Sequence, residues 1–240
     1  MPLDNLLMKL RVRDEVSLAE EGALRDAISQ VRDCPADRHL LREGQEPGAS
    51  TLLLDGLVCR YRDLRNAERQ ITALHISGDF VDLHSFSLKS VDHNIMTLTP
   101  CRVATVPHAR LLEITETRPH LTRLLWFLTN LDAAIQREWE VSLGRRSALA
   151  RTAHIFCELR VRLSLIGQAA ETGYKLKLTQ IEISECIGLT AVHLNRTLRE
   201  LRERGLMEFR RGEVTIMDLP ALEELAEFRP AYLHLEHRPH

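Results

Sequence analysis

The sequence contains few cysteines, and those present are scattered. No two of the five are spaced as Cys-x-x-Cys: Cys34, Cys59, Cys101, Cys157 and Cys186. Zinc sites, iron–sulfur clusters and disulfide frameworks all need paired or closely spaced thiols. We therefore expect five free thiols in a reducing compartment, with no metal and no cofactor.

The sequence also lacks any stretch of about 18 uncharged apolar residues, so it predicts no membrane-spanning helix. The N-terminus has no basic segment followed by an apolar one, and we expect no secretory signal. Both absences favour a cytoplasmic protein that makes no membrane contact. The chain has 240 residues, of which 44% are apolar and 28% charged. This size and composition are typical of a soluble protein with two domains.

Motifs that would indicate an enzyme are missing as well. Four histidines of the N-terminal half form no His-x-His or His-x-x-x-His pair, so we interpret them as ordinary polar residues: His75, His84, His93 and His108. We find no phosphate-binding glycine loop and no Ser-His-Asp set. A metal-dependent oxygenase with a β-roll fold stays as an alternative, which analysis of bound metal would test.

Neither sign of charge dominates the whole chain, because the net charge is −2. The distribution is uneven. Residues 145–215 contain 13 Lys and Arg against 8 Asp and Glu, residues 1–144 contain 17 against 21, and residues 216–240 contain 2 against 5. The positive charge is thus confined to one segment, as a localised phosphate-binding face requires.

Residues 34–107 alternate short β-favouring stretches with turn signals such as Asp55-Gly56 and Pro100. The predicted strands are residues 52–54, 57–61, 71–74 and 101–106. Turns at this spacing indicate a β-sandwich or barrel. A helix is expected before it, over residues 16–31.

After Pro107 the pattern becomes helical. Apolar residues recur at steps of three and four: Leu121, Leu124, Leu125, Leu128, Leu131, Ile135 and Trp139. With Pro119 in the first turn, a helix of about 25 residues, or ~37 Å, is predicted up to residue 143. This length suits a dimer seam, and packing only against the chain's own β-domain is the alternative. The pattern breaks at Gly144, where we place a hinge before a helix opened by Arg145-Arg146-Ser147.

Two short helices are predicted around Gly188. Thr179 followed by Glu182 forms a capping box, so a helix begins near Gln180. Gly188 ends it, and Thr190 can cap a second helix. The buried stripe of this second helix would contain Val192 or Leu194, with Leu198 and Leu201. Two helices joined by a tight glycine turn are typical of a helix-turn-helix, whose second helix enters the DNA major groove.

The second helix has a polar face of residue types that contact DNA: Thr190, His193, Asn195, Arg196 and Arg199. Arginine binds guanine with two hydrogen bonds, and asparagine does the same with adenine. Residues 208–216 then predict a β-hairpin that turns near Arg211-Gly212, so Arg210 and Arg211 would lie at the tip of a wing. A helical core with solvated charges is the alternative.

In these features the chain resembles the CRP/FNR family (cyclic-AMP receptor protein and fumarate-nitrate regulator), over nearly its whole length. The most specific part is Leu178–Met207, with Thr179-Gln180-x-Glu182-Ile183, Gly188-Leu189-Thr190, Asn195-Arg196 and Gly205-Leu206. The N-terminal half is similar to the family's cyclic-nucleotide-binding β-roll at Arg42-Glu43-Gly44, Leu54-x-Gly56-x-Val58, Gln70-Ile71 and Gly78-Asp79-Phe80. The long helix corresponds to the family's dimerisation helix, and residues 144–147 to its hinge.

The chain departs from the family's known effector sites. Members that bind cyclic AMP hold its phosphate with an Arg-Ser pair after a Gly-Glu segment, whereas residues 90–95 here contain no arginine. Asp92 in this stretch would repel a phosphate. Members with an iron–sulfur cluster need several N-terminal cysteines, and only Cys34 is available. We expect neither ligand.

The second helix also departs from the family. Several members recognise cytosine with a glutamate where this chain has Val192, and Ala191 replaces a neighbouring arginine. Arg196 corresponds to the family's guanine-recognising arginine. The resemblance therefore implies a half-site that keeps a guanine contact but differs elsewhere, with His193 and Asn195 as substitutes.

Together these features predict an α+β protein with an N-terminal jelly-roll β domain (1–118), a dimerisation helix and hinge (119–144) and a C-terminal winged helix-turn-helix (145–240). The expected partners are double-stranded DNA, a second copy of the chain, RNA polymerase and an unidentified small-molecule effector. The predicted DNA-binding residues are Thr179, Gln180, Thr190, His193, Asn195, Arg196, Arg199, Arg210 and Arg211. The predicted dimerisation residues are Leu121, Leu124, Leu128, Leu131, Ile135 and Trp139.

An apolar sensory pocket would be lined by Gly78, Asp79, Phe80, Leu83 and Phe86, for which core packing is the alternative. The alternative function is a small-molecule sensor that acts through protein contacts, with weak or lost DNA binding. Retention of DNA fragments at low salt separates the two functions.

Overall fold

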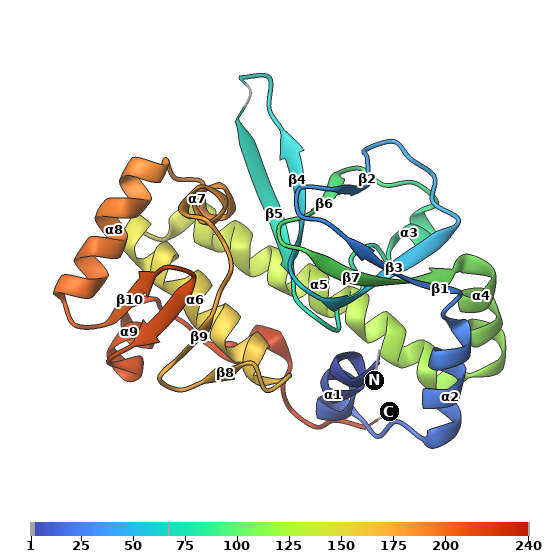
Figure 1. Cartoon of the computed structure of the whole chain (residues 1–240). Helices are drawn as coiled ribbons and strands as arrows, with labels where there is room; N and C mark the ends of the chain where they lie inside the picture. Colours follow the sequence, from blue (N-terminus) through green and yellow to red (C-terminus); the bar gives the residue numbers. More distant parts are fainter. Residues whose placement is uncertain (1–2, 67, 240) are drawn as a thin grey trace. The chain divides into compact units, whose positions relative to one another are not determined.

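The structure is a computed structural model that describes residues 3–66 and 68–239. Its contacts divide the chain into two compact units (Figure 1). The N-terminal unit contains the residues up to Arg62, Ala73–Ala133 and the residues from His234 onward. The C-terminal unit contains Asp63–Thr72 and Ala134–Leu233. Within the described residues, no helix has both the length and the apolarity that a membrane span needs.

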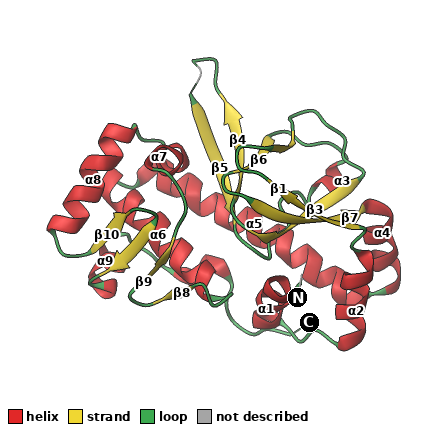
Figure 2. Ribbon diagram, viewed as in Figure 1, coloured by secondary structure: helices red, strands yellow, loops and turns green. Residues whose placement is uncertain are grey.

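The N-terminal unit is built on two antiparallel sheets (Figure 2). The first has the order β1-β7-β3, formed by Gln30–Cys34, Cys101–Pro107 and Ala49–Asp55. The second has the order β2-β6-β4-β5, formed by His39–Leu41, Asn94–Thr97, Val58–Asp63 and Arg69–His75. Between them lies an apolar cluster that includes Leu53, Val81, Ile95 and Val103. The predicted jelly-roll domain is thereby confirmed.

Four helices of this unit accompany the sheets: α1 (Asp4–Arg13), α2 (Leu18–Ala27), α3 (Ser85–Leu88) and α4 (His108–Thr117). Ser17 and Glu20 form a capping box at the start of α2, which fixes where this helix begins. The helix predicted over residues 16–31 is therefore shorter than expected, because the chain enters β1 at Gln30. Helix α1 was not predicted, and its Leu6, Leu7 and Leu10 are buried in the core.

The long helix α5 spans Pro119–Arg145. It continues through Gly144, so the break predicted there is wrong, and the next helix begins only after the N-cap Ser147. Leu121 and Leu124 are fully buried in the core of the N-terminal unit. Their periodicity marks a face that packs inside the chain, the alternative that the sequence left open, and a dimer seam along α5 stays a prediction.

The remaining predicted dimerisation residues differ in exposure. Ile135 and Trp139 are buried, and the indole Nε1 of Trp139 donates a hydrogen bond to Glu158 Oε2 at 2.9 Å. Leu128 and Leu131 are half-buried. The exposed apolar side chains of α5 are instead Trp126 and Val141, which are 67% and 51% exposed. The most exposed apolar side chains of α5 are therefore not among the predicted dimerisation residues.

The residues predicted to line a sensory pocket have packing roles, the alternative that the sequence left open. Phe80 and Leu83 are buried in the core, and Phe86 packs against it. A Cβ atom at Gly78, whose φ is +89°, would lie 2.7 Å from the backbone of Asn5 in α1. Asp79 pairs with Lys9 of the same helix at 2.6 Å. This segment therefore holds α1 against the β-roll.

The C-terminal unit contains α6 (Ala148–Ser164), α7 (Gln180–Ile187), α8 (Ala191–Glu203), α9 (Leu219–Leu225) and the short 3-10 helix Pro230–Leu233. Its sheet has the order β10-β11-β9-β8, formed by Met207–Arg210, Glu213–Ile216, Gly173–Lys175 and Ala169–Ala170. The helices after α5 and the sheet together make a winged helix-turn-helix arrangement (Figure 1).

A buried polar network fixes α6 in this unit. Glu158 has no exposed surface and accepts hydrogen bonds from Trp139, Arg162 and Tyr232. Burial, together with the nearby Glu158 carboxylate, raises the pKa of Tyr232, so this hydroxyl stays a donor at any physiological pH. The network joins the end of α5, α6 and the C-terminal segment, and it gives the helix-turn-helix a rigid base.

Candidate nucleic-acid interface

Helix α7 has a capping box at its start and a left-handed glycine after its end. The Thr179 hydroxyl accepts a hydrogen bond from Glu182 N, and the Glu182 side chain accepts one from Thr179 N, so the predicted capping box is present. Gly188 follows the helix with φ +61°, in the left-handed region that favours glycine. The chain can therefore turn within three residues and start α8.

Helix α8 buries one face and exposes the other. Thr190 caps it by accepting a hydrogen bond from His193 N at 3.2 Å. Leu194, Leu198 and Leu201 are buried, and Thr197 bonds Thr152 of α6 at 3.1 Å. Of the two candidates for the buried stripe, Leu194 is the correct one, because Val192 is 67% exposed.

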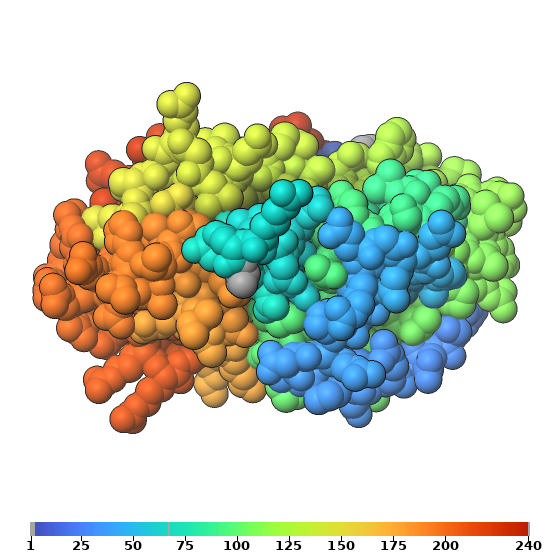
Figure 3. All heavy atoms as spheres, turned by 90° about the horizontal axis from the view of Figure 1, so that it is seen from above, coloured from blue at the N-terminus to red at the C-terminus, as the bar shows by residue number. Residues whose placement is uncertain are grey.

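All the residues predicted to contact DNA lie at or near the surface of the C-terminal unit. Gln180 is half-buried, and the others are exposed: Thr179, Thr190, His193, Asn195, Arg196, Arg199, Arg210 and Arg211. Figure 3 shows the segment that includes α7 and α8, in orange, as open surface. Asn195 Nδ2 donates to Gln180 Oε1 at 3.0 Å, so these two side chains from neighbouring helices are oriented by each other.

The arginines of this region fall into two groups. Three on the later turns of α8 each pair with a glutamate: Arg199 with Glu203, Arg202 with Glu208 and Arg204 with Glu200. The side chains of Arg196, Arg210 and Arg211 have no hydrogen bond or ion pair with any residue that the structure describes. Their donors are free for an outside acceptor, as binding to bases or phosphates requires.

The wing is a hairpin of β10 and β11, in which Arg210 pairs with Glu213 in register. The two turn residues, Arg211 and Gly212, have φ values of +53° and +75°. Two successive positive φ values are typical of the tight turn that matches the twist of a hairpin. Arg211 therefore occupies a backbone conformation that disfavours most side chains, at the place where the sequence predicted the wing tip.

Sequence reasoning missed the two strands that complete the wing sheet. Ala169–Ala170 and Gly173–Lys175 are too short to give a β pattern, and they are defined by pairing with each other and with β11. Gly173 was needed there, because a Cβ atom at this position would lie 2.1 Å from Val214 O. The glycine itself was visible in the sequence. The reason for it was not, because the Val214 backbone that it accommodates lies 41 positions further on.

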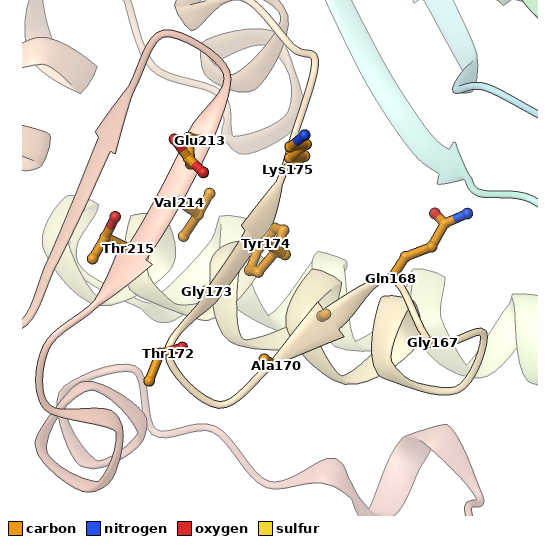
Figure 4. Close-up of a pocket in the computed structure, with 11 residues that line it drawn as sticks. Gly167, Gln168, Ala170, Thr172, Gly173, Tyr174, Lys175, Glu213, Val214 and Thr215 are labelled. Carbon is orange, nitrogen blue, oxygen red and sulfur yellow. The ribbon is translucent and has the colours of Figure 1, made fainter.

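A depression of about 670 Å³ lies on this sheet (Figure 4). Its lining comes from the loop before β8, from β8 and β9, and from β11, and it includes Lys175 opposite Glu213. The hydroxyl of Tyr174 is directed toward α6 and donates to Phe156 O at 2.8 Å. None of the lining residues belongs to α7 or α8, so the depression is separate from the candidate interface.

The five cysteines are all buried free thiols. Among the described residues, no group of three or more His, Cys, Asp or Glu is arranged to hold a metal ion. The exposed arginines, amides and hydroxyls of α7, α8 and the wing suit hydrogen bonding to a polyanion.

Comparisons with known proteins agree with this geometry. Residues 31–118 match the family model described as a cyclic nucleotide-binding domain, and residues 150–225 match the Crp-like helix-turn-helix domain. The nitrogen fixation regulation protein FixK of Bradyrhizobium diazoefficiens is 29% identical over 179 residues, covering 72% of each chain. The transcriptional activator FnrA of Stutzerimonas stutzeri is 24% identical, covering 88% of this chain and 86% of its own.

The fold has solved counterparts. The structure of FixK2 from Bradyrhizobium japonicum superposes with a TM-score of 0.75 at 22% identity, covering 82% of this chain and 96% of that one. A β-roll domain followed by a winged helix-turn-helix defines a class of DNA-binding transcription regulators. The chain belongs to the CRP/FNR family of that class.

Proposed function

We propose that the protein regulates transcription as a homodimer that binds a palindromic DNA site, under control of a signal other than cyclic AMP. The observation that carries the proposal is the unpaired, exposed state of Arg196, Arg210 and Arg211 beside the polar face of α8. In this arrangement α8 enters the major groove and the wing lies along the backbone.

Within α8 the residues have separate tasks. Arg196 binds guanine through two hydrogen bonds, and Val192, which is exposed on the same helix, makes apolar contact with the methyl group of thymine. Thr179 and Thr190 sit at helix starts, whose first backbone amides have no acceptor within the helix and suit a phosphate. Arg210 and Arg211 bind phosphates from the wing.

The dimer forms along α5. Helical spacing places Trp126, Ala133 and Arg137 on one face, and Val141 lies one turn further along near the same face. Trp126 and Val141 are the exposed apolar residues of this helix. A twofold axis along this face would present two copies of α8 to successive major grooves, about 34 Å apart.

The charge of Asp92 supports a signal other than cyclic AMP. The stretch that corresponds to the phosphate-binding segment contains Asp92, which is 83% exposed at its side chain and bonds His93 at 2.7 Å. Although burial acts to raise it, the hydrogen bond and charge of His93 lower the pKa of Asp92. The carboxylate therefore stays ionised and would repel a cyclic phosphate.

The relatives named as transcriptional activators favour a further contact with RNA polymerase. Work on DNA requires a cytoplasmic location, which is part of the same proposal.

Retention of genomic fragments in a gel-shift assay tests the proposal. At low salt we expect selective retention with two chains bound per fragment, and a steep loss of binding as salt rises because phosphate contacts release counterions. If no fragment is retained, the output is a protein contact instead and DNA regulation is refuted.

The dimer can be tested separately with Trp126→Glu. Because Trp126 is exposed, the fold should persist, while sedimentation should show a monomer and DNA affinity should fall with it. The matched variant Leu112→Glu changes an exposed leucine of α4 and should remain dimeric. A dimeric Trp126→Glu protein would contradict this seam.

A further inference from the structure

The hairpin between β4 and β5 belongs by its contacts to the C-terminal unit, although its strands are part of the β-roll. Residues Asp63–Thr72 group with Ala134–Leu233. Within this hairpin, Asp63 and Arg69 form an ion pair at 3.4 Å. The side-chain amide of Gln70 bonds residues more than 110 positions later in the sequence.

The end of α7 leaves carbonyl groups that the helix itself does not satisfy. The amide of Leu189 would ordinarily bond the carbonyl of Glu185, four residues earlier. It bonds Ser184 O at 3.0 Å instead, and Gly188 N bonds the same oxygen. This pattern accompanies the left-handed turn at Gly188. The carbonyl of Glu185 therefore needs a donor from outside the helix.

Gln70 supplies this donor. Its Nε2 lies 2.8 Å from Glu185 O and 3.2 Å from Cys186 O, and it also donates to Ile71 O at 2.9 Å. Its Oε1 is 3.6 Å from the position of a Cβ atom on Gly188, which places the amide directly beside the turn. One side chain thus binds two carbonyls in the last turn of α7 and lies beside the glycine about which the chain turns into α8.

Other residues of the hairpin and of α5 also lie close to the turn at Gly188. Glu185 is half-buried, and its neighbours include the charges of Arg69 and Asp63 from the hairpin. Leu143 of α5 also packs beside Gly188, with its Cδ2 atom 3.2 Å from the point where a Cβ atom on that glycine would lie. The turn is therefore held by both the hairpin and the end of α5.

We propose that Gln70 is a positioning residue for DNA recognition, which holds the turn between α7 and α8 so that α8 presents Arg196 at a fixed angle. The proposal rests on the DNA-binding function proposed above. The hairpin residues Asp63–Thr72 then contribute to DNA recognition as part of the unit that contains α8.

Three variants isolate the amide donor. Gln70→Glu keeps the shape but removes the donor, and it places a negative charge at the negative end of α7. Gln70→Lys keeps a donor and adds a charge that a helix C-terminus favours. Gln45→Glu is the matched control, because this glutamine lies in the N-terminal unit and uses its oxygen, which accepts from Arg42 N at 2.8 Å.

Hydrogen exchange of the Gly188 and Leu189 amides in the full-length protein measures the turn without DNA. For Gln70→Glu we expect exchange faster by about 5-fold, with wild-type rates in Gln70→Lys and Gln45→Glu. Unchanged exchange in Gln70→Glu would overturn the proposal, whether or not the protein binds DNA.

The affinity of each variant for a retained genomic fragment measures how strongly the turn affects DNA binding. We expect Gln70→Glu to bind about 3- to 10-fold more weakly and Gln70→Lys to recover at least part of the loss. Faster exchange with unchanged affinity would also overturn the proposal, because the turn would then not limit recognition. Failure of the wild-type protein to bind any fragment would refute the proposed function, and the exchange result would then judge the role of Gln70 in holding the turn.

Discussion

One arginine from each unit, Arg60 and Arg196, shows two opposite settings for a guanidinium. In the N-terminal unit Arg60 is 3% exposed, and its guanidinium donates to Val81 O at 3.0 Å and to Asp132 of α5 at 2.6 Å. In the C-terminal unit Arg196 is exposed and has no ion pair or hydrogen bond with the described residues. The Arg60 guanidinium stabilises the folded unit, whereas the Arg196 guanidinium is available to a binding partner.

The difference shows how this chain divides its polar groups between stability and binding. A buried arginine must be paired, because an unpaired buried charge costs several kcal/mol. The interior around Arg60 also contains Asp82, His84 and His93, and burial, with the charge of Arg60 second, lowers the pKa of His84 to about 3. The buried polar groups around Arg60 therefore act on one another, whereas the donors of Arg196, Arg210 and Arg211 are available to a partner.

The largest expected effect is on stability, from Asp82→Asn. Burial raises the pKa of Asp82 to about 7, although the amide of Thr51 and the charge of Arg60 act against it. The folded protein therefore holds this proton more tightly than the unfolded chain does. The stability that the proton contributes is present below about pH 4 and is lost as the pH rises to about 7.

Asparagine cannot lose such a proton, and it can still accept the hydrogen bond from Thr51 N, which is 2.6 Å from Asp82 Oδ1. The free energy of unfolding of Asp82→Asn, relative to wild type, should increase by about 1.4 kcal/mol per pH unit across this window. Urea unfolding at pH 4, 6 and 8 measures it. A difference that does not change with pH would show that Asp82 is ionised inside the β-roll.

The next effect is on DNA recognition, from Arg196→Ala. We expect a loss of about 1–3 kcal/mol on the preferred site, with relaxed preference at one base of each half-site and unchanged stability. Fluorescence anisotropy on specific and random duplexes measures it. Arg204→Ala is the matched control, since Arg204 pairs with Glu200 at the end of α8. An equal loss on both duplexes would mean that Arg196 contacts only phosphate.

A change of specificity rather than strength is expected from Val192→Glu. A carboxylate at this exposed position can accept a hydrogen bond from the amino group of cytosine, which valine cannot. The variant should gain a preference of about 1 kcal/mol for cytosine at one base pair of the half-site. Val192→Gln, of the same shape as glutamate but uncharged, should favour adenine instead, to which a glutamine side chain makes two hydrogen bonds. Binding to a panel of single-base variants measures both, and an unchanged base preference would remove Val192 from the interface.

The smallest effect is expected from Arg211→Gly in the wing. Glycine relieves the cost of the positive φ of +53° and should stabilise the fold by about 0.5–1 kcal/mol. The loss of one phosphate contact should lower the slope of log affinity against log salt by about 1. Thermal unfolding and salt titration measure the two results. A variant that is more stable and keeps the wild-type salt slope would leave Arg211 without a role in binding.

The helix-turn-helix could be predicted from the sequence because its signals are local. The capping pair Thr179 and Glu182, the turn at Gly188 and the hairpin turn at Arg211-Gly212 each act within about four residues. The same is true of the strands of the β-roll, which are separated by short turns. Here local propensity and the final fold agree, as expected where a segment determines its own structure.

Features that depend on distant partners could not be predicted. The periodicity of α5 identified an apolar face, but it could not show that Leu121 and Leu124 pack in the chain's own core rather than against a second copy. Gly144 was expected to end the helix, yet α5 runs through it, because a glycine inside a helix costs only about 1 kcal/mol. The contact of Gln70 with Glu185 spans 115 positions and leaves no local pattern.

The proposed function depends on the recognition of one DNA site by two copies of α8. This dependence is tested when the full-length protein selects its preferred sequence from a pool of random duplexes. We expect an inverted repeat whose half-sites are centred one helical turn apart, about 34 Å, with a guanine in each half that is no longer enriched when Arg196→Ala is used. Enriched sequences without twofold symmetry, or no enrichment at all, would contradict a dimer that presents α8 to DNA.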